Sequence, residues 1–238
     1  MFNKRLFVLA GGFGTRLRNI VSDRPKPLAP IGDTPFLQIQ LNHWVNQGAH
    51  DFVFLLHHQA NQIIDFVLDL ESSLPKKCRY RFVTESHPLG TGGAVANAVR
   101  QLCQEDSFLV TNADTWLGEG LNKLAKAAVP SIGMIRVADV SRYGSLIVNE
   151  KGQVIGFTEK GDYSGNGSIN AGLYHLHPNN FTNWNGRAIS LEKDIFPILA
   201  HEQHLHAVEL DSDFIDIGIP ADYHRFSHGV ESGSVKSI

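Results

Sequence analysis

The sequence predicts an α/β fold built on a mostly parallel sheet with helices on both of its faces. In the first half of the chain, short apolar runs alternate with longer amphipathic segments, a pattern typical of parallel strands joined by crossover helices. The chain has 238 residues, of which 42% are hydrophobic and 19% charged, enough for one large domain with a core. We therefore expect a single domain over residues 1–238. Its ligands should bind at the edge where the carboxyl ends of the strands meet.

The first half should hold four strands and three helices. Short apolar runs predict buried strands at 6–10 and 52–56, and two further strands are expected at 79–84 and 107–113. The first helix has clear end signals, with Thr34 as its N-terminal cap, Pro35 at its first position and Gly48 as its stop. Two further helices are expected at 59–70 and 92–102. Each crossover between parallel strands then has a helix, as this sheet type requires.

The second half is richer in strands. Apolar runs predict strands at 131–138, 169–176 and 206–210, and a hairpin formed by 146–148 and 154–157. One helix is expected at 190–199. A short apolar segment at 214–218 carries Asp216, and the polar tail from Glu231 should be frayed.

Charge and composition exclude several classes of function. With 21 Lys and Arg against 24 Asp and Glu, the net charge is −3, so no broad basic face is expected for a nucleic-acid backbone. No apolar segment approaches the roughly 20 residues of a membrane span, and the N-terminal run meets glycine too early for a signal peptide. Cys78 and Cys103 are far apart without a CxxC pattern, which favours free thiols in the cytoplasm.

A glycine-rich loop follows the first predicted strand. Residues 9–16 read LAGGFGTR, and Lys26 follows between two prolines. Glycines let backbone N–H groups approach phosphate oxygens, and Arg16 can add a bidentate contact. A Walker A loop would end in Gly-Lys-Ser/Thr, and a dinucleotide fingerprint would have glycine where Leu17 stands. The simpler alternative is a tight turn that needs glycine only for its sharpness.

Two aspartates about a hundred residues apart are the candidate metal ligands. Asp114 ends the fourth predicted strand, and Asp216 lies between Ile215 and Ile217. A carboxylate in an apolar setting needs a partner, and a hard divalent cation such as Mg²⁺ would supply one. The alternative is that each aspartate caps a turn or a helix.

Several motifs together resemble the signature of the sugar-1-phosphate nucleotidyltransferases. The glycine loop and Pro25-Lys26-Pro27-Leu28 resemble the start of that signature. Further matching motifs follow in the family's order: Leu89-Gly90-Thr91-Gly92-Gly93-Ala94, Asn112-Ala113-Asp114, Phe157-Thr158-Glu159-Lys160, Asn170-Ala171-Gly172 and Phe214-Ile215-Asp216-Ile217-Gly218. The likeness covers about residues 6 to 225. Within the family, the short length and the stretch at 22–30 are most similar to D-glycero-D-manno-heptose 1-phosphate guanylyltransferases.

The resemblance implies a Rossmann-like three-layer α/β/α fold and a role for individual residues. It implies a nucleotide-binding half at 1–115 and a sugar-binding half at 116–230. Arg16, Lys26 and Asp114 would be catalytic, and Asp114 with Asp216 would hold Mg²⁺. The implied nucleotide-binding residues are Leu9, Ala10, Gly11, Gly12, Gly14, Thr15, Glu85, Gly90, Thr91 and Gly93. The implied sugar-binding residues are Asn112, Gly144, Glu159, Lys160 and Asn170.

The expected reaction joins a sugar 1-phosphate to a nucleoside triphosphate and releases pyrophosphate. The subfamily resemblance implies that the substrates are GTP and D-glycero-D-manno-heptose 1-phosphate. The enzyme would work in the cytoplasm, and its product would be used for surface polysaccharide synthesis. Mannose 1-phosphate guanylyl transfer stays open, as do uridylyl or thymidylyl transfer to a hexose or N-acetylmuramate 1-phosphate. A regulatory module that binds NDP-sugar without turnover and a nicotinamide-dependent oxidoreductase are the alternatives from other classes. The expected partners are these two substrates, without nucleic acid or membrane, and a homo-oligomer stays open.

Overall fold

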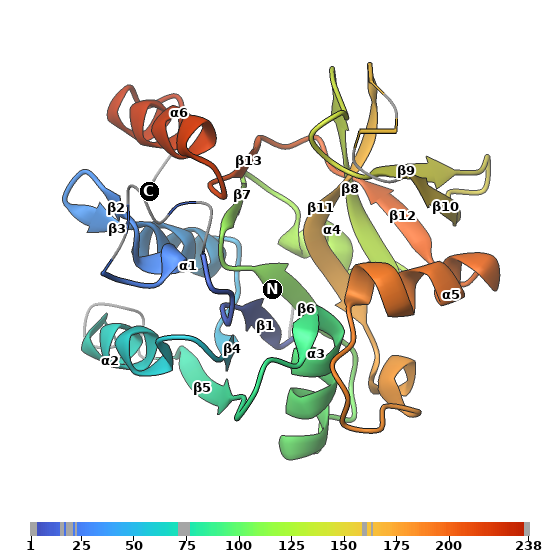
Figure 1. Cartoon of the computed structure of the whole chain (residues 1–238), viewed down its shortest axis with the longest axis horizontal. Helices are drawn as coiled ribbons and strands as arrows, with labels where there is room; N and C mark the ends of the chain where they lie inside the picture. Colours follow the sequence, from blue (N-terminus) through green and yellow to red (C-terminus); the bar gives the residue numbers. More distant parts are fainter. Residues whose placement is uncertain are drawn as a thin grey trace. The chain divides into compact units, whose positions relative to one another are not determined.

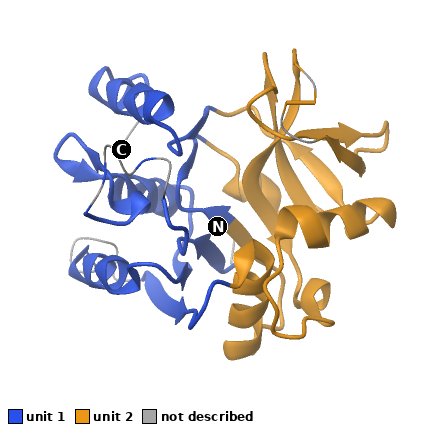
Figure 2. Cartoon of the chain, viewed as in Figure 1, with its two compact units in different colours: residues 1–88, 111–118, 213–238 blue, residues 89–110, 119–212 orange. Residues whose placement is uncertain are grey.

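The computed structural model describes residues 4–14, 17, 21, 23–70, 77–158, 161–162 and 164–235. The chain forms two compact units (Figure 2). Unit 1 consists of Met1–Pro88, Thr111–Gly118 and Asp213–Ile238, and unit 2 of Leu89–Val110 and Glu119–Ser212. Each unit therefore takes segments from both halves of the chain. The division into a nucleotide-binding half and a sugar-binding half stays a prediction.

Unit 1 is built around three parallel strands, β1 (Leu6–Leu9), β4 (Asp51–Leu56) and β5 (Arg79–Thr84). β1 pairs with β4, and β4 pairs with β5 (Figure 1). Helix α1 (Phe36–Asn46) precedes β4, and α2 (Ala60–Leu70) follows it. All of these elements were predicted from the sequence. The structure explains why: β4 is almost entirely buried, and each helix turns apolar residues toward the core.

Shorter elements complete unit 1, and they correct one prediction. They are a 3₁₀ turn η2 (Lys26–Leu28), β2 (Pro30–Ile31), β3 (Thr34–Pro35), β7 (Thr115–Leu117), β13 (Phe214–Asp216) and α6 (Pro220–Glu231). Thr34 was predicted to cap α1, and this prediction is wrong. Thr34 pairs with Ile31 in a small hairpin, and Pro35 stands at the cap position. Gly32 has a φ of +57°, which the hairpin turn requires and which glycine adopts without strain.

An apolar cluster holds the peripheral elements of unit 1 together. Trp116 of β7 and Phe226 of α6 are almost fully buried in it, and their rings stand 5.3 Å apart. Phe36 of α1 meets Phe226 edge to face at 4.9 Å. The cluster therefore fixes β7, which follows Asp114, against α1 and α6.

Unit 2 combines helices with a mixed sheet. Its elements are α3 (Gly90–Gln101), α4 (Leu121–Ala125), β8 (Ser131–Val137), β9 (Ser145–Val148), β10 (Val154–Thr158), β11 (Gly167–Leu176), the 3₁₀ turn η4 (Pro178–Phe181), the π-helix η5 (Leu191–Ile195), α5 (Phe196–His201) and β12 (His206–Glu209). β6 (Phe108–Asn112) begins in unit 2 and ends in unit 1. β11 is antiparallel to β8 and β9, β9 forms the predicted hairpin with β10, and β12 is parallel to β8. The α/β class with a mixed sheet is thus confirmed, while the predicted helix at 190–199 divides into η5 and α5.

Two smaller findings concern the membrane and the thiols. Within the described ranges, every helix is too short or too polar to cross a bilayer. Cys78 is buried and Cys103 is exposed, and both are free thiols.

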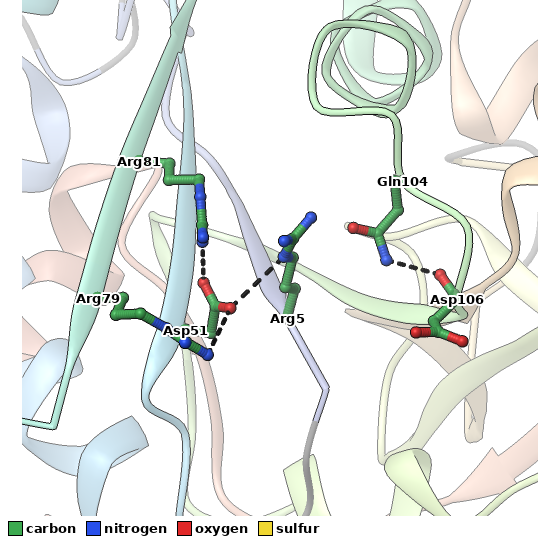
Figure 3. Close-up of polar contacts among 6 residues, drawn as sticks. All are labelled: Arg5, Asp51, Arg79, Arg81, Gln104 and Asp106. Carbon is green, nitrogen blue, oxygen red and sulfur yellow. Dashed lines mark hydrogen bonds and ion pairs between the residues drawn. The ribbon is translucent and has the colours of Figure 1, made fainter.

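A single carboxylate joins the amino-terminal ends of the three parallel strands. Asp51, the first residue of β4, forms ion pairs with Arg5, Arg79 and Arg81, and Figure 3 shows the three guanidinium groups around it. The distances are 3.1 Å to Arg79 and 3.5 Å to Arg5, and the Asp51 side chain is only 14% exposed. The cluster fixes the strand ends opposite the glycine loop.

Replacing Asp51 by alanine should lower the free energy of unfolding by about 2 kcal/mol, because three guanidinium groups lose their carboxylate. Urea unfolding followed by circular dichroism measures this loss. Asp65→Ala, at an exposed position of α2, is the control and should change the free energy by less than about 0.5 kcal/mol. Equal stability of the two variants would contradict a stabilising role for the cluster.

Candidate active site

Lys26 is held on a rigid turn. Pro25 precedes η2 in an extended conformation, and the N–H groups of Leu28 and Ala29 donate to the carbonyls of Pro25 and Lys26 at 2.8 and 3.0 Å. The proline rings on both sides restrict the backbone further. Tyr223 of α6 donates its hydroxyl to the Pro30 carbonyl, which ties the segment after the turn to α6. Only 9% of the Lys26 side chain is exposed, so it is almost buried within the site.

The Lys26 ammonium lies between the two predicted metal ligands. Its Nζ is 2.6 Å from Asp114 Oδ2 and 3.4 Å from Asp216 Oδ1. The antiparallel pair of β7 and β13 brings these aspartates together, and the Ile217 N–H donates to the Asp114 carbonyl at 3.0 Å. The structure thus unites three residues that the sequence separates by as many as 190 positions.

Gly218 makes room for this arrangement. Its N–H donates to Asp216 Oδ1 at 2.8 Å, which orients the carboxylate. A Cβ at this position would meet Asp216 Oδ1 at 2.7 Å and Lys26 Nζ at 2.9 Å, closer than side chains tolerate. The glycine therefore belongs to the site, although sequence reasoning gave it no role.

The glycine loop, Lys26 and Asp114 line one cavity within unit 1. The cavity measures about 370 Å³ and is lined by Leu9, Ala10, Gly12, Phe13, Gly14, Lys26, Pro27, Ala113, Asp114 and Gly218. The Ala113 N–H donates to the Leu9 carbonyl at 3.0 Å, which places the end of β6 beside the start of the loop. Gly14 has a φ of +59°, a conformation that favours glycine. The cavity is large enough for part of a nucleotide.

His57 supports the loop from the next strand. It follows the carboxyl end of β4, and a Cβ on Gly11 would approach its Cβ and N to 3.2 Å. Its Nδ1 is 3.2 Å from the carbonyl oxygen of Glu85, a predicted nucleotide-binding residue. Exposed Phe13 packs edge-on against the His57 ring at 5.7 Å. The sequence could have indicated His57, because it follows the carboxyl end of a predicted strand and ligands bind at that edge of the sheet.

The glycines at 90 and 93 have a packing role within unit 2. A Cβ on Gly90 would meet the Ile189 carbonyl oxygen at 2.5 Å, and one on Gly93 would meet Leu89 Cβ at 2.9 Å. Thr91 lies inside α3, and its hydroxyl donates to Glu192 at 2.8 Å. These contacts explain the residue types without a nucleotide, so the predicted nucleotide contacts of the three residues stay predictions.

The structure describes some of the remaining predicted site residues and not others. Asn112 ends β6 in unit 1, while Gly144 and Asn170 belong to unit 2. A Cβ on Gly144 would meet the Thr158 carbonyl oxygen at 2.9 Å. The predictions for Thr15, Arg16, Glu159 and Lys160 lie outside the described residues.

Three residues close to the Lys26 segment have shifted pKa values. The Arg24 guanidinium, 3.2 Å from the Asp23 carboxylate, lowers the pKa of Asp23 through its hydrogen bonds, and Asp23 raises the pKa of Arg24 in return. Burial raises the pKa of the Tyr223 phenol, so the phenol keeps its proton and continues to donate to Pro30 at neutral pH. Both pairs therefore have fixed protonation states around neutrality.

The donor set at the cavity fits a divalent cation that brings other ligands with it. Asp114 and Asp216 already share one cation, the Lys26 ammonium. Among the residues with a described structure, no cluster of three or more His, Cys, Asp or Glu side chains could hold a metal ion. Mg²⁺ needs no such cluster, because it often takes one or two carboxylates and completes its shell with phosphates and water.

Comparison with known protein sequences points to one family. The family model described as nucleotidyl transferase matches residues 6–233. The D-glycero-alpha-D-manno-heptose 1-phosphate guanylyltransferase of Campylobacter jejuni is 34% identical over 92% of this chain and 96% of its own. Mannose-1-phosphate guanylyltransferase 1 of Arabidopsis thaliana is also 34% identical over 92% of this chain, which spans 62% of that relative.

Solved structures agree with the sequence comparison. HddC from Yersinia pseudotuberculosis superimposes with a TM-score of 0.83 at 33% identity, covering 95% of this chain and 99% of its own. HddC complexed with GMP-PN gives a TM-score of 0.81 at 32% identity, with the same coverage. The family match, the relatives and the shared fold place this chain in the nucleotidyl transferase family, among the sugar-1-phosphate nucleotidyltransferases.

Proposed function

We propose that the protein transfers the guanylyl group of GTP to D-glycero-D-manno-heptose 1-phosphate, producing GDP-heptose and pyrophosphate. The observation that supports this most is the position of Lys26 between Asp114 and Asp216, at a cavity lined by the glycine loop. Guanylyl transfer is common to the heptose and mannose relatives named above. The heptose relative supports the choice of sugar, because this chain spans 96% of it.

The reaction needs positioning and charge neutralisation more than proton transfer. A phosphate oxygen of the sugar 1-phosphate forms a bond to the α-phosphorus of GTP, and the bond from that phosphorus to the bridging oxygen of the β-phosphate breaks. Pyrophosphate leaves with the electron pair of that bond. The second pKa of a phosphate monoester is about 6, so the nucleophile is largely ionised at pH 7. A general base and a covalent intermediate are both unnecessary.

Two anions must approach each other, so the residues of the site should supply positive charge. Lys26, at the edge of the cavity, would supply one positive charge, and backbone N–H groups of residues 11–14 would bind phosphate oxygens. We assign Arg16, outside the described residues, to the same task. The proposed roles of Leu9, Ala10, Thr15, Glu85, Gly90, Thr91 and Gly93 at the nucleotide, and of Asn112, Gly144, Glu159, Lys160 and Asn170 at the sugar, follow the family resemblance.

Nucleotidyl transferases generally use a divalent metal ion, and we propose Mg²⁺ for this chain. Asp114 and Asp216 would hold it, and Gly218 leaves the space that the Asp216 carboxylate needs. When bound, the cation would neutralise phosphate charge as it develops. The Lys26 ammonium, which now occupies the place between the carboxylates, would turn toward the phosphates.

A matrix of substrates tests the proposed function. GTP, UTP, dTTP and CTP are each combined with heptose, mannose, glucose and N-acetylmuramate 1-phosphates, and pyrophosphate release is measured. The proposal expects the fastest release from GTP with the heptose 1-phosphate. A faster rate with mannose 1-phosphate would replace the sugar, and no release with any pair would favour a module that only binds NDP-sugar.

The place of the reaction follows from its substrates. Because GTP is a cytoplasmic metabolite, we propose that the protein works in the cytoplasm and supplies an activated sugar for lipopolysaccharide or capsule synthesis. Radiolabelled heptose incorporated into surface polysaccharide should fall when the gene is deleted.

Gly218→Ala should lower turnover by about a hundredfold while changing the thermal midpoint by only a few degrees. The added Cβ displaces the Asp216 carboxylate and the Lys26 ammonium, and a misplacement of about 1 Å can cost this much in rate. Steady-state pyrophosphate release measures the effect. Gly156→Ala is the matched control, because a Cβ there would meet only the Ile147 side chain at 3.4 Å, an ordinary contact distance, and neither glycine has a positive φ. Equal rates in the two variants would remove Gly218 from the site.

A further inference from the structure

The Glu192 carboxylate is the centre of a hydrogen-bond network in unit 2. Its Oε2 accepts from the hydroxyls of Thr91 at 2.8 Å and Ser190 at 2.7 Å. Its Oε1 accepts from the Tyr174 hydroxyl at 3.5 Å. The Tyr174 hydroxyl in turn accepts from Asn170 Nδ2 at 3.0 Å. A continuous chain of hydrogen bonds therefore leads from α3 to Asn170, a residue proposed to bind the sugar.

The first turn of η5 holds Glu192 firmly. Ser190 caps this π-helix, and its oxygen accepts from the N–H groups of Glu192 and Lys193. The Leu191 N–H donates to the Thr91 hydroxyl oxygen at 2.9 Å. Since π-helical turns are rare and are frequently found at functional sites, the local geometry supports a role beyond packing.

The chemistry of the Glu192 carboxylate sets the direction of each hydrogen bond between Glu192 and Asn170. An ionised carboxylate only accepts, so the Tyr174 hydroxyl must donate its one hydrogen to Glu192. The hydroxyl oxygen is then an acceptor for Asn170, which must present its Nδ2 there. The Asn170 oxygen consequently faces the Gly172 N–H at 2.8 Å. One amide orientation satisfies all three bonds.

This orientation leaves a defined set of groups for a ligand. Beyond the two bonds described, the Asn170 amide has a second N–H and a second oxygen lone pair. Adjacent hydroxyls of a sugar need such a donor and acceptor at fixed places. Tyr174 is 1% exposed and packs against Phe196 at 4.9 Å between ring centres, so its hydroxyl cannot shift to another partner easily.

We infer that Glu192 is a positioning residue for the sugar 1-phosphate: through Tyr174 it fixes the orientation of the Asn170 amide. Thr91 and Ser190 hold the carboxylate in place for this purpose. The inference rests on the proposed function, because it assigns Asn170 to the sugar. It predicts that damage to the network affects the sugar substrate and leaves the nucleotide substrate alone.

Two conservative variants interrupt the network at different points. Tyr174→Phe removes only the hydroxyl between Glu192 and Asn170. In Glu192→Gln, the amide oxygen can keep the bonds from Thr91 and Ser190. The amide nitrogen then faces Tyr174 and donates to its hydroxyl, so this hydrogen bond is reversed. Each variant should raise the KM for the sugar 1-phosphate about tenfold, the effect of one lost hydrogen bond. The KM for GTP should change less than about twofold, with kcat close to that of the wild type.

Coupling to Asn170 separates positioning from a general loss of structure. In an Asn170→Ala background, Tyr174→Phe should raise the sugar KM no further, because there is no amide left to orient. Glu202→Gln is the matched control, because it replaces an exposed carboxylate after α5 by the same carboxamide. It should leave both KM values unchanged. The inference is overturned by effects that multiply in the double variant, by equal increases in both KM values, or by an unchanged sugar KM.

A measurement without turnover keeps the inference testable if the proposed function fails. Failure of the proposed function would appear as a wild-type chain that releases no pyrophosphate with any substrate pair. The side-chain amide resonances of Asn170, read by ¹H–¹⁵N NMR of the full chain, still report its orientation. They should shift in Tyr174→Phe and Glu192→Gln and stay unchanged in Glu202→Gln. Unchanged resonances in the first two variants would overturn the inference by themselves.

Discussion

Asp114→Asn should lower turnover by about a thousandfold and leave the fold intact. The substitution removes one negative charge from the pair of carboxylates that would hold the divalent ion, while the amide keeps the side chain's size. Electrostatic groups of this kind contribute about 10² to 10³ in rate. The Asp114 side chain is 36% exposed, so its neutralisation should not unfold the protein.

Pyrophosphate release with saturating Mg²⁺, GTP and sugar 1-phosphate measures the Asp114 effect. Asp211→Asn makes the same charge change at an exposed position and should retain wild-type turnover. Circular dichroism and the thermal midpoint of both variants should match the wild type. Turnover like that of the wild type in Asp114→Asn would refute a metal role for this carboxylate.

Lys26→Met should have opposite effects on turnover and on metal binding. Turnover should fall about a hundredfold or more, because the ammonium proposed to neutralise the phosphates is lost. In the absence of nucleotide, however, the variant should bind Mn²⁺ about tenfold more tightly than the wild type. The reason is that Lys26 Nζ, 2.6 and 3.4 Å from the two carboxylates, competes with a metal ion for them.

Free Mn²⁺ counted by electron paramagnetic resonance measures this affinity. Lys126→Met, at an exposed position of unit 2, removes the same charge and should leave affinity and turnover unchanged. A Lys26→Met variant with the turnover of the wild type would exclude Lys26 from the phosphate site. Weaker Mn²⁺ binding in Lys26→Met would show that the ammonium does not compete with the metal.

The sequence predicted the parts of the fold in which one residue pattern dominates. β1 and β4 are buried apolar runs, and their period and length leave little alternative. α6 was missed because its buried residues, among them Tyr223 and Phe226, stand among His and Arg residues that weaken the apolar stripe. Thr34 gave a strong cap signal, but the hairpin of β2 and β3 used the same residues. Tertiary pairing overrode a local preference there.

Contacts between residues distant in sequence limited how much of the site could be predicted. The glycine loop, Lys26, Asp114 and Asp216 were found because motifs of the family stand in its order. Their meeting depends on β7 and β13, strands of three residues each, which are too short to predict from periodicity. Glu192 was missed for the same reason, since its partner Thr91 is 101 residues away. Gly218 could only be understood once the atoms around it were known.

The most direct test is an anomalous difference map from crystals grown with Mn²⁺ and a non-hydrolysable GTP analogue. The account predicts a single strong peak between the carboxylates of Asp114 and Asp216, within coordination distance of both. It also predicts that Lys26 Nζ has left this place for the phosphates, which lie over residues 11–14. A peak that touches neither carboxylate, or a nucleotide bound away from the glycine loop, would contradict it.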